Sequence, residues 1–254
     1  LPIVPHGISQ VLLAQFDRIM IRSMVGDAAA GIYSLAGNVQ LVLTVLTDSI
    51  ATVWSTWFYQ KMDANDTKDI QHRAFQLCRM FAALCVGMIA IAPEIIWILG
   101  GKQYEQATYV AVPLIMVSFV LFVYNVVVDA EYYSQKTTYI MYCTLAAAMI
   151  DIVLNLFFVS RFGFVAAAYT TLTSYIFYLI FHMQLSRKLL GFAIMRWSQV
   201  LTLGMAVVLA AAISLLLRQN ILLRYLLELV LFAVVGGKAA VQEVQTFLKT
   251  RKGE

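Results

Sequence analysis

The chain contains few charged residues. Asp, Glu, Lys and Arg make up 13% of its 254 residues, whereas an average soluble domain has about 25%. Hydrophobic residues make up 61% of the sequence, and the mean hydropathy is +0.80. Because water leaves no place for so much apolar surface, this composition indicates a lipid environment. The net charge of +4 is too small to indicate a nucleic-acid partner.

Cysteine and the common catalytic motifs are also scarce. The spacing of Cys78, Cys85 and Cys143 fits neither a disulfide framework nor a zinc site, and all three lie in apolar runs as small core residues would. The sequence has no Walker A loop, no Gly-rich dinucleotide turn, no H-E-x-x-H and no G-x-S-x-G. We therefore expect no cofactor, no metal centre and no enzymatic activity, and an ATP-driven pump is disfavoured.

Long apolar runs dominate what is present. About 20 mostly apolar residues in a helix cross a hydrocarbon core of roughly 30 Å. Eight such runs occupy residues 3–24, 30–58, 75–99, 108–133, 138–160, 164–186, 197–217 and 220–236. Their connections are short, except for a charged loop predicted at Lys61–Ala74, and the tail from Lys238 is predicted to be a short amphipathic helix on the membrane surface. The pattern predicts an all-α, polytopic membrane helix bundle of about eight transmembrane helices.

The distribution of Lys and Arg predicts the orientation. With eight spans, 12 of the 18 basic residues fall on the side that carries both chain ends, five fall on the other side, and Arg18 lies within the first span. Cytoplasmic loops are enriched in Lys and Arg, so both ends are predicted to be cytoplasmic.

Polar residues recur every three or four positions in five of the eight runs, and such residues share one helix face. A shared aqueous or ligand cavity needs polar faces of this kind. The last two runs consist almost entirely of Leu, Ala and Val and are expected to be peripheral. Their charged residues Arg224 and Glu228 are four apart and spaced to pair with each other. The polar faces comprise His6, Gln10 and Asp17; Gln40, Thr44, Thr47, Asp48 and Ser55; Ser118, Asn125, Asp129, Tyr132 and Lys136; Thr144, Asp151 and Asn155; and Thr171, Ser174, Tyr178 and His182.

Charged residues deep in a membrane are costly, so those present are expected to serve a function or a buried ion pair. For Asp17, Arg18, Asp48 and Asp151 both readings stay open, the structural one being a pair between Arg18 and either Asp17 or Asp48. Shallower groups have simpler explanations. We expect Asp129 and Glu131 to be solvated near one surface, His182 to be interfacial and Glu94 to cap a kinked helix, while hydroxyl residues such as Thr171 and Ser174 join helices by hydrogen bonds.

Four segments resemble a known family. They read FDRIMIRSMVGDAAAGIYSLAGNV (Phe16–Val39), APEIIWILGGKQYEQATYVAVPLI (Ala92–Ile115), EYYSQKTTYI (Glu131–Ile140) and NLFFVSRFGFVAAAYTTLTSY (Asn155–Tyr175). In order and spacing they are similar to the C-terminal lobe of bacterial polysaccharide flippases of the O-antigen type. These flippases belong to the multidrug/oligosaccharidyl-lipid/polysaccharide exporter superfamily.

The resemblance implies a transporter of 12 or 14 helices in two lobes around a central cavity. Such flippases carry undecaprenyl-pyrophosphate-linked oligosaccharide across the bacterial inner membrane for surface polysaccharide, including lipopolysaccharide. Residues 1–190 would form the six-helix C-terminal lobe, and residues 191–254 two additional peripheral helices and a cytoplasmic tail. The N-terminal lobe is missing, so the chain is expected to be an incomplete copy that needs that lobe as a partner.

Residue types suggest roles within such a cavity. Guanidinium groups pair well with phosphate oxygens, which makes Arg18, and one turn further out Arg22, candidates for the pyrophosphate. Candidates for binding sugar hydroxyls are Gln40, Tyr124, Asn125 and Asn155. The acidic residues Asp17, Asp48 and Asp151, with Asp129, are candidates for coupling to a gradient of H⁺ or Na⁺.

Three alternatives remain open. A drug/cation antiporter of the same superfamily would favour carboxylates and aromatic residues over Arg18. A membrane-embedded polysaccharide polymerase or acyltransferase would need a large outer loop with catalytic residues, and the predicted outer loops are short. A structural membrane subunit would not need polar faces on five helices.

Overall fold

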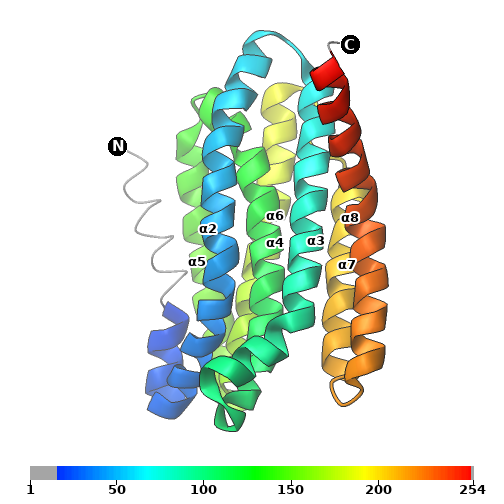
Figure 1. Ribbon diagram of the computed structural model, residues 1–254. Helices are drawn as coiled ribbons and strands as arrows, with labels where there is room; N and C mark the ends of the chain where they lie inside the picture. Colours follow the sequence, from blue (N-terminus) through cyan, green and yellow to red (C-terminus); the bar gives the residue numbers. More distant parts are fainter. Residues whose placement is uncertain (1–15, 253–254) are drawn as a thin grey trace.

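The computed structural model describes the backbone of residues 16–252 and the side chains of residues 16–237, and every regular element in this part is helical. After a helical segment at residues 16–24, the elements are α2 (Asp27–Asp63), α3 (Thr67–Gly100), the 3₁₀ helix η1 (Lys102–Ala107), α4 (Thr108–Tyr133), α5 (Thr137–Phe162), α6 (Phe164–Leu190), α7 (Trp197–Leu216) and α8 (Ile221–Lys252). The long helices run alongside one another as one bundle (Figure 1). The predicted all-α membrane helix bundle is confirmed.

Helix α4 is the centre of this bundle. It packs against α2, α3, α5, α6 and α7, and most of its side chains are buried. Its sequence explains this position, because apolar residues lie around most of the helix and only one narrow face, with Ser118, Asn125 and Asp129, is polar. The faces of the neighbouring helices that point toward α4 supply the rest of the core. They include Phe81 on α3, whose ring stacks on that of Phe122 on α4 with the centroids 4.0 Å apart.

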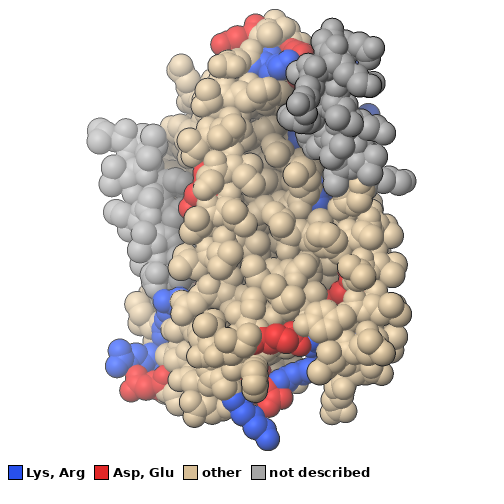
Figure 2. Space-filling view, viewed as in Figure 1, with Lys and Arg blue, Asp and Glu red and all other residues tan. Residues whose placement is uncertain are grey.

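The outer surface suits a membrane. Within the described residues, six helices are long and apolar enough to cross one: Asp27–Asp63, Thr67–Gly100, Lys102–Tyr133, Thr137–Phe162, Phe164–Leu190 and Trp197–Leu216. Large apolar side chains remain exposed on them, such as Trp97 at 67% and Phe162 at 70%. Charged side chains gather mainly toward the two ends of the face in Figure 2. The first predicted span lies mostly outside the described residues, and a span at 220–236 stays a prediction.

The long charged loop predicted at Lys61–Ala74 is wrong. Helix α2 continues to Asp63 and α3 begins at Thr67, so only three residues form the turn. Asp66 ends this turn as an N-cap, accepting a hydrogen bond from the backbone N–H of Asp69 at 3.3 Å. Lys61 bridges the turn, with its Nζ 2.9 Å from Asp66 and 2.7 Å from Asp69. Charge lowered the hydropathy of this segment, but these pairings make its residues compatible with helix.

Helices α7 and α8 pack along α3 at the edge of the bundle (Figure 1). The predicted pair of Arg224 with Glu228 is wrong, because the ion pair that the structure shows joins Arg224 of α8 to Glu94 of α3. Arg224 and Glu228 are both buried, so α8 docks through a charged contact as well as through apolar surface. This also replaces the predicted capping role of Glu94. Helix α8 continues without a break into the tail that was predicted to be a separate surface helix.

Candidate functional site

A polar cavity of about 460 Å³ lies beside α2 and α4, between these helices, α6 and the helical segment 16–24. Four of the five predicted polar faces contribute residues to it, whereas the polar residues Asp151 and Asn155 of α5 are not part of the lining. The lining has charged, amide, hydroxyl and phenol groups: Asp17, Arg18, Tyr33, Gln40, Thr44, Thr47, Asp48, Ser118, Tyr124, Asn125, Tyr132, Thr171 and Tyr175. A cavity of this polarity at membrane depth can accommodate a ligand that hydrocarbon excludes.

Arg18 is the basic residue of this lining. It is half-buried, and no carboxylate of the described residues lies within ion-pair distance of its guanidinium. The predicted structural pair between Arg18 and Asp17 or Asp48 is therefore not formed. The guanidinium lies over Gly37 of α2, where an added Cβ would be only 2.8 Å from Nη2. Gly37 thus makes room for Arg18, whose charge remains available to an anion.

Asp17 is buried at one wall of the cavity and accepts three hydrogen bonds. Tyr33 Oη of α2 donates to Oδ2 at 2.7 Å, and Thr171 Oγ1 of α6 donates to the same oxygen at 2.7 Å. Asn155 Nδ2 of α5 donates to Oδ1, also at 2.7 Å. One carboxylate thereby joins the segment 16–24 to three helices that are distant in sequence.

A second carboxylate lies directly behind the first. Asp151 is buried, and its Oδ2 accepts a bond from the same Asn155 Nδ2 at 3.2 Å. Ser174 donates to Asp151 Oδ1 at 3.3 Å, and Thr170 donates to Asn155 Oδ1 at 2.5 Å. We call Asp17, Asp151, Asn155, Thr170 and Thr171 the carboxylate cluster.

The carboxylate cluster lacks a positive partner within the described chain. Neither Asp17 nor Asp151 forms an ion pair there, and two like charges this close repel strongly in a medium of low polarity. Carboxylate, amide and hydroxyl oxygens are the atoms that a hard cation prefers, and a carboxylate can alternatively hold a proton. The described residues contain no group of three or more His, Cys, Asp or Glu that would hold a metal ion.

The structure separates the other candidates into two groups. Gln40, Asp48, Tyr124 and Asn125 line the cavity with Asp17 and Arg18, whereas Asn155 and Asp151 lie behind Asp17. Arg22 is outside the cavity and forms an exposed ion pair with Asp27 at 2.6 Å.

Asp129 is also outside the lining, held by Ser55 Oγ at 2.8 Å and Tyr59 Oη at 3.3 Å. The prediction that Asp129 is solvated is wrong, because only 4% of its surface is exposed. His6 and Gln10 lie outside the described residues.

Sequence reasoning missed Tyr33, Gly37 and Tyr175 as parts of the cavity wall. A signal for two of them was available, since Tyr33 and Gly37 precede Gln40 and Thr44 at the same spacing of three to four residues. The polar face on this helix was read only from Gln40 onward, although Tyr33 carries a hydroxyl like Tyr132 and Tyr178, and Gly37 has no side chain that would register as polar. Thr171 and Ser174 were read as helix-joining residues, and they do join helices, but through the carboxylates.

Comparison with known proteins gives partial matches. No family model matches the chain, and no solved structure matches it. The "Lsg locus putative protein 1" of Haemophilus influenzae is 23% identical over 156 residues, which cover 59% of this chain and 38% of that protein. An "Uncharacterized membrane protein" of the same organism is 25% identical over 154 residues, covering 59% of this chain and 37% of that protein. The chain thus spans less than two fifths of the length of these relatives, and it is a membrane protein by its helices and its likeness to them.

Proposed function

We propose that this chain is the C-terminal part of a bacterial polysaccharide flippase of the multidrug/oligosaccharidyl-lipid/polysaccharide exporter superfamily. It would translocate undecaprenyl-pyrophosphate-linked oligosaccharide across the inner membrane, with both chain ends in the cytoplasm. The observation that carries this proposal is the unpaired Arg18 guanidinium in a polar cavity between membrane helices. A cation at that depth needs an anion, and a pyrophosphate that crosses the membrane is an anion of suitable size and charge.

The lining of the cavity suits both parts of such a headgroup. Arg18 offers a forked set of N–H donors to the pyrophosphate oxygens. Gln40 and Asn125 lie in the same lining and are only half-buried, so their amides can exchange hydrogen bonds with sugar hydroxyls. Tyr124 offers a ring face and a hydroxyl. The polyprenyl chain would stay in the bilayer, against the exposed apolar side chains of the outer surface.

The carboxylate cluster would couple translocation to an ion gradient. Binding one H⁺ or Na⁺ removes one of the two negative charges of Asp17 and Asp151, and losing it leaves two buried carboxylates that repel each other. Because Asp17, Asn155 and Thr171 belong to different helical elements, this change alters how the segment 16–24 is held against α5 and α6. Asp48 in the open cavity and Asp129 beside α2 are further positions where a proton can bind on the way.

The partner implied by this proposal is an N-terminal lobe that closes the other side of the cavity. The match to this chain covers 38% and 37% of the two relatives, so both relatives are long enough to contain a further lobe. No nucleic acid and no catalytic reaction are part of the proposal.

A drug/cation antiporter of the same superfamily is the second candidate. Asp17, Asp48 and the rings of Tyr33, Tyr124 and Tyr132 favour a cationic ligand at the same cavity. Arg18 disfavours it, because an unpaired guanidinium repels a cation.

Complementation tests the two candidates directly. The complete gene is expressed in a bacterial strain that lacks its flippase, and surface polysaccharide is measured by gel and antibody for several repeat-unit structures. We expect restored polysaccharide and no change in resistance to cationic drugs. Increased drug resistance without polysaccharide would support the antiporter instead, and neither phenotype with a well-inserted protein would contradict transport of both kinds.

Gly37 provides a test of how Arg18 is positioned. In the complete transporter, Gly37→Ala should lower polysaccharide export, because the new methyl group forces Nη2, at the far end of the Arg18 side chain, to shift. Stability should stay the same or rise, since alanine is more favourable than glycine in a helix by roughly 0.5–1 kcal/mol. Gly31→Ala on the same helix is the matched control, as an added Cβ there meets nothing within 4 Å. Equal export by the two variants would show that Arg18 can shift away from the added methyl group without loss of export.

A further inference from the structure

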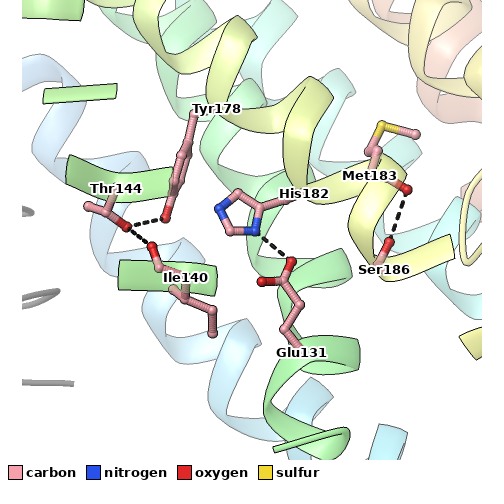
Figure 3. A network of polar contacts seen from close by, with 7 residues as sticks. All are labelled: Glu131, Ile140, Thr144, Tyr178, His182, Met183 and Ser186. Atoms are coloured by element: carbon pink, nitrogen blue, oxygen red, sulfur yellow. Dashed lines mark hydrogen bonds and ion pairs between the residues drawn. The ribbon is translucent and has the colours of Figure 1, made fainter. Parts of the chain in front are cut away.

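Helix α6 contacts its neighbours differently at its two ends. Toward its C-terminal end, His182 lies against α4, with Nδ1 2.6 Å from Oε1 of Glu131 (Figure 3). Both residues have 0% of their surface exposed, so the predictions that Glu131 is solvated and that His182 is interfacial are wrong. Tyr178 and Tyr124 pack on the imidazole, with ring centroids 4.3 Å and 4.9 Å from it. This end of α6 is therefore enclosed by protein.

Toward its N-terminal end, α6 leaves a groove beside α5. The groove has a volume of about 420 Å³, within the roughly 300–1,000 Å³ that is typical of pockets for small molecules. We call it the α5–α6 groove, and no residue lines both this groove and the polar cavity. It is lined by Leu154, Phe158 and Phe162 of α5 and by Val165, Ala166, Tyr169, Thr170 and Thr173 of α6.

The surface of the α5–α6 groove is apolar. The rings of Phe158 and Phe162 stack with their centroids 6.0 Å apart, and both side chains remain exposed. The two threonines use their hydroxyl protons within the protein, since Thr173 donates to a carbonyl of its own helix at 2.8 Å and Thr170 to Asn155 Oδ1 at 2.5 Å. Among the described residues, the lining contains no Asp, Glu, Lys or Arg. A surface with so few free hydrogen-bonding groups suits a hydrocarbon chain better than a polar ligand.

The position of the groove matches one leaflet of a bilayer. Helices α5 and α6 are both long and apolar enough to cross a membrane, and they are joined by the single residue Gly163. From Phe162 at this turn to Leu154, the lining covers about 12 Å of α5 at a rise of 1.5 Å per residue. Half of a hydrocarbon core is roughly 15 Å thick. A lipid chain that lies in the groove therefore places its headgroup beside the turn.

Arg161 gives this end of the groove a positive charge. It lies in the last turn of α5 next to Phe162, and it shares a helix face with Phe158 and Leu154, three and seven positions earlier. Arg161 is exposed and forms no ion pair with the described residues. The first turn of α6 has no acidic residue that would neutralise it. An unpaired arginine at the level of the headgroups attracts an anionic lipid.

We propose that the α5–α6 groove binds an anionic phospholipid, with one acyl chain against Phe158, Ala166 and Thr170 and the phosphate at Arg161. The negative charge of the lipid complements the unpaired guanidinium, and the apolar groove takes the chain. Thr170 also bonds to Asn155 of the carboxylate cluster, so an occupied groove adds packing behind that bond. The site does not depend on what the cavity carries.

Photolabelling of the full chain in phosphatidylcholine vesicles tests this proposal. The vesicles contain a small fraction of phosphatidylglycerol with a photoreactive group in its acyl chain, and mass spectrometry of peptides locates the label after illumination. We expect more label on residues 154–162 and 165–173 than on exposed apolar residues of α2, such as Val45 and Val53. The same photoreactive chain on phosphatidylcholine should label the groove about fivefold less, because one basic residue near the surface contributes about this factor to the affinity for an anionic lipid.

Three variants separate charge from shape. Arg161→Gln should lower the label from the phosphatidylglycerol probe about fivefold and leave that from the phosphatidylcholine probe unchanged. Arg22→Gln is the matched control, since it removes a basic residue from the same end of the bundle whose charge is already paired with Asp27, and it should leave both labels unchanged. Ala166→Phe fills the groove and should lower the label from both probes. Circular dichroism checks that its helices are intact.

The proposal fails on any of three outcomes. Label spread evenly over the exposed helices of the unmodified chain, or equal label from the two probes, would mean that the groove meets only ordinary bilayer lipid, and neither measurement needs a variant to fold. Undiminished label in Arg161→Gln would exclude Arg161 as the headgroup contact. Displacement of the probe by polyprenyl phosphate but not by unlabelled phosphatidylglycerol would assign the groove to a polyprenyl lipid instead.

Discussion

Replacing Arg18 by alanine in the complete transporter should reduce surface polysaccharide by at least tenfold without reducing the amount of protein in the membrane. A hydrogen bond to a charged group contributes about 1.5–3 kcal/mol, and each 1.4 kcal/mol corresponds to a factor of about ten in an equilibrium constant. The fold should tolerate the change, since Arg18 is half-buried and has no carboxylate partner in the described chain to leave behind. Quantitative gels for polysaccharide and immunoblots of membranes measure the two effects.

Two matched variants make this result specific. Arg18→Lys keeps the charge but loses the forked donor geometry, so export should fall to an intermediate level. Arg22→Ala, one turn away, removes an exposed ion pair with Asp27, and such pairs contribute little. Export by that variant should stay close to normal. Unchanged polysaccharide in Arg18→Ala would remove Arg18 from the mechanism and with it the main support for an anionic substrate.

Asp17→Asn should also abolish export, and for a different reason. Three donors converge on the Asp17 carboxylate, so an amide places its own NH₂ group against at least one of them. The cluster then also loses a charge that a proton or Na⁺ can neutralise. Thr171→Ala is the comparison, because it removes one donor while the carboxylate stays. It should cost about 1 kcal/mol of stability and leave export largely intact.

Thermal unfolding of the chain separates an ion site from a purely structural cluster. A ligand that binds the folded state at 100 times its Kd stabilises it by roughly 2.7 kcal/mol. Added Na⁺ or a lower pH should therefore raise the Tm of the unmodified chain but not that of Asp17→Asn. If neither ion raises the Tm, and Asp17→Asn loses folded protein in proportion to export, the carboxylate cluster serves only to hold the helices together.

Much of the helical framework could be predicted from hydropathy alone. The apolar run at 108–133 is α4 with the same bounds, and the run at 138–160 differs from α5 by one or two residues at each end. Such runs are unambiguous, because buried backbone groups in a membrane must bond within the helix. The error at Lys61–Ala74 arose because charge was taken as a sign of loop. Hydropathy cannot distinguish a polar helix end from a loop, whereas the N-cap at Asp66 does.

The site was predicted in part. Spacing placed polar residues on single faces, and four of those faces do meet in one cavity. Spacing did not reveal that Asn155 bonds to Asp17, 138 positions away, or that Glu131 and His182, 51 positions apart, are enclosed together, since such contacts join residues distant in sequence. Arg18 and Arg22 are equivalent in a helical pattern, yet one lines the cavity and the other pairs with Asp27 outside it.

The sequence by itself determined the membrane environment, the helical class and the helix faces that are polar, because these follow from local hydropathy and from the 3.6-residue period of the helix. The tertiary structure alone decided which polar groups neutralise one another and which remain free. That outcome depends on how helices rotate and pack around α4, and it leaves Arg18 without a carboxylate while two carboxylates share one asparagine. The unpaired guanidinium and the two neighbouring carboxylates are the groups that give this cavity its chemical character.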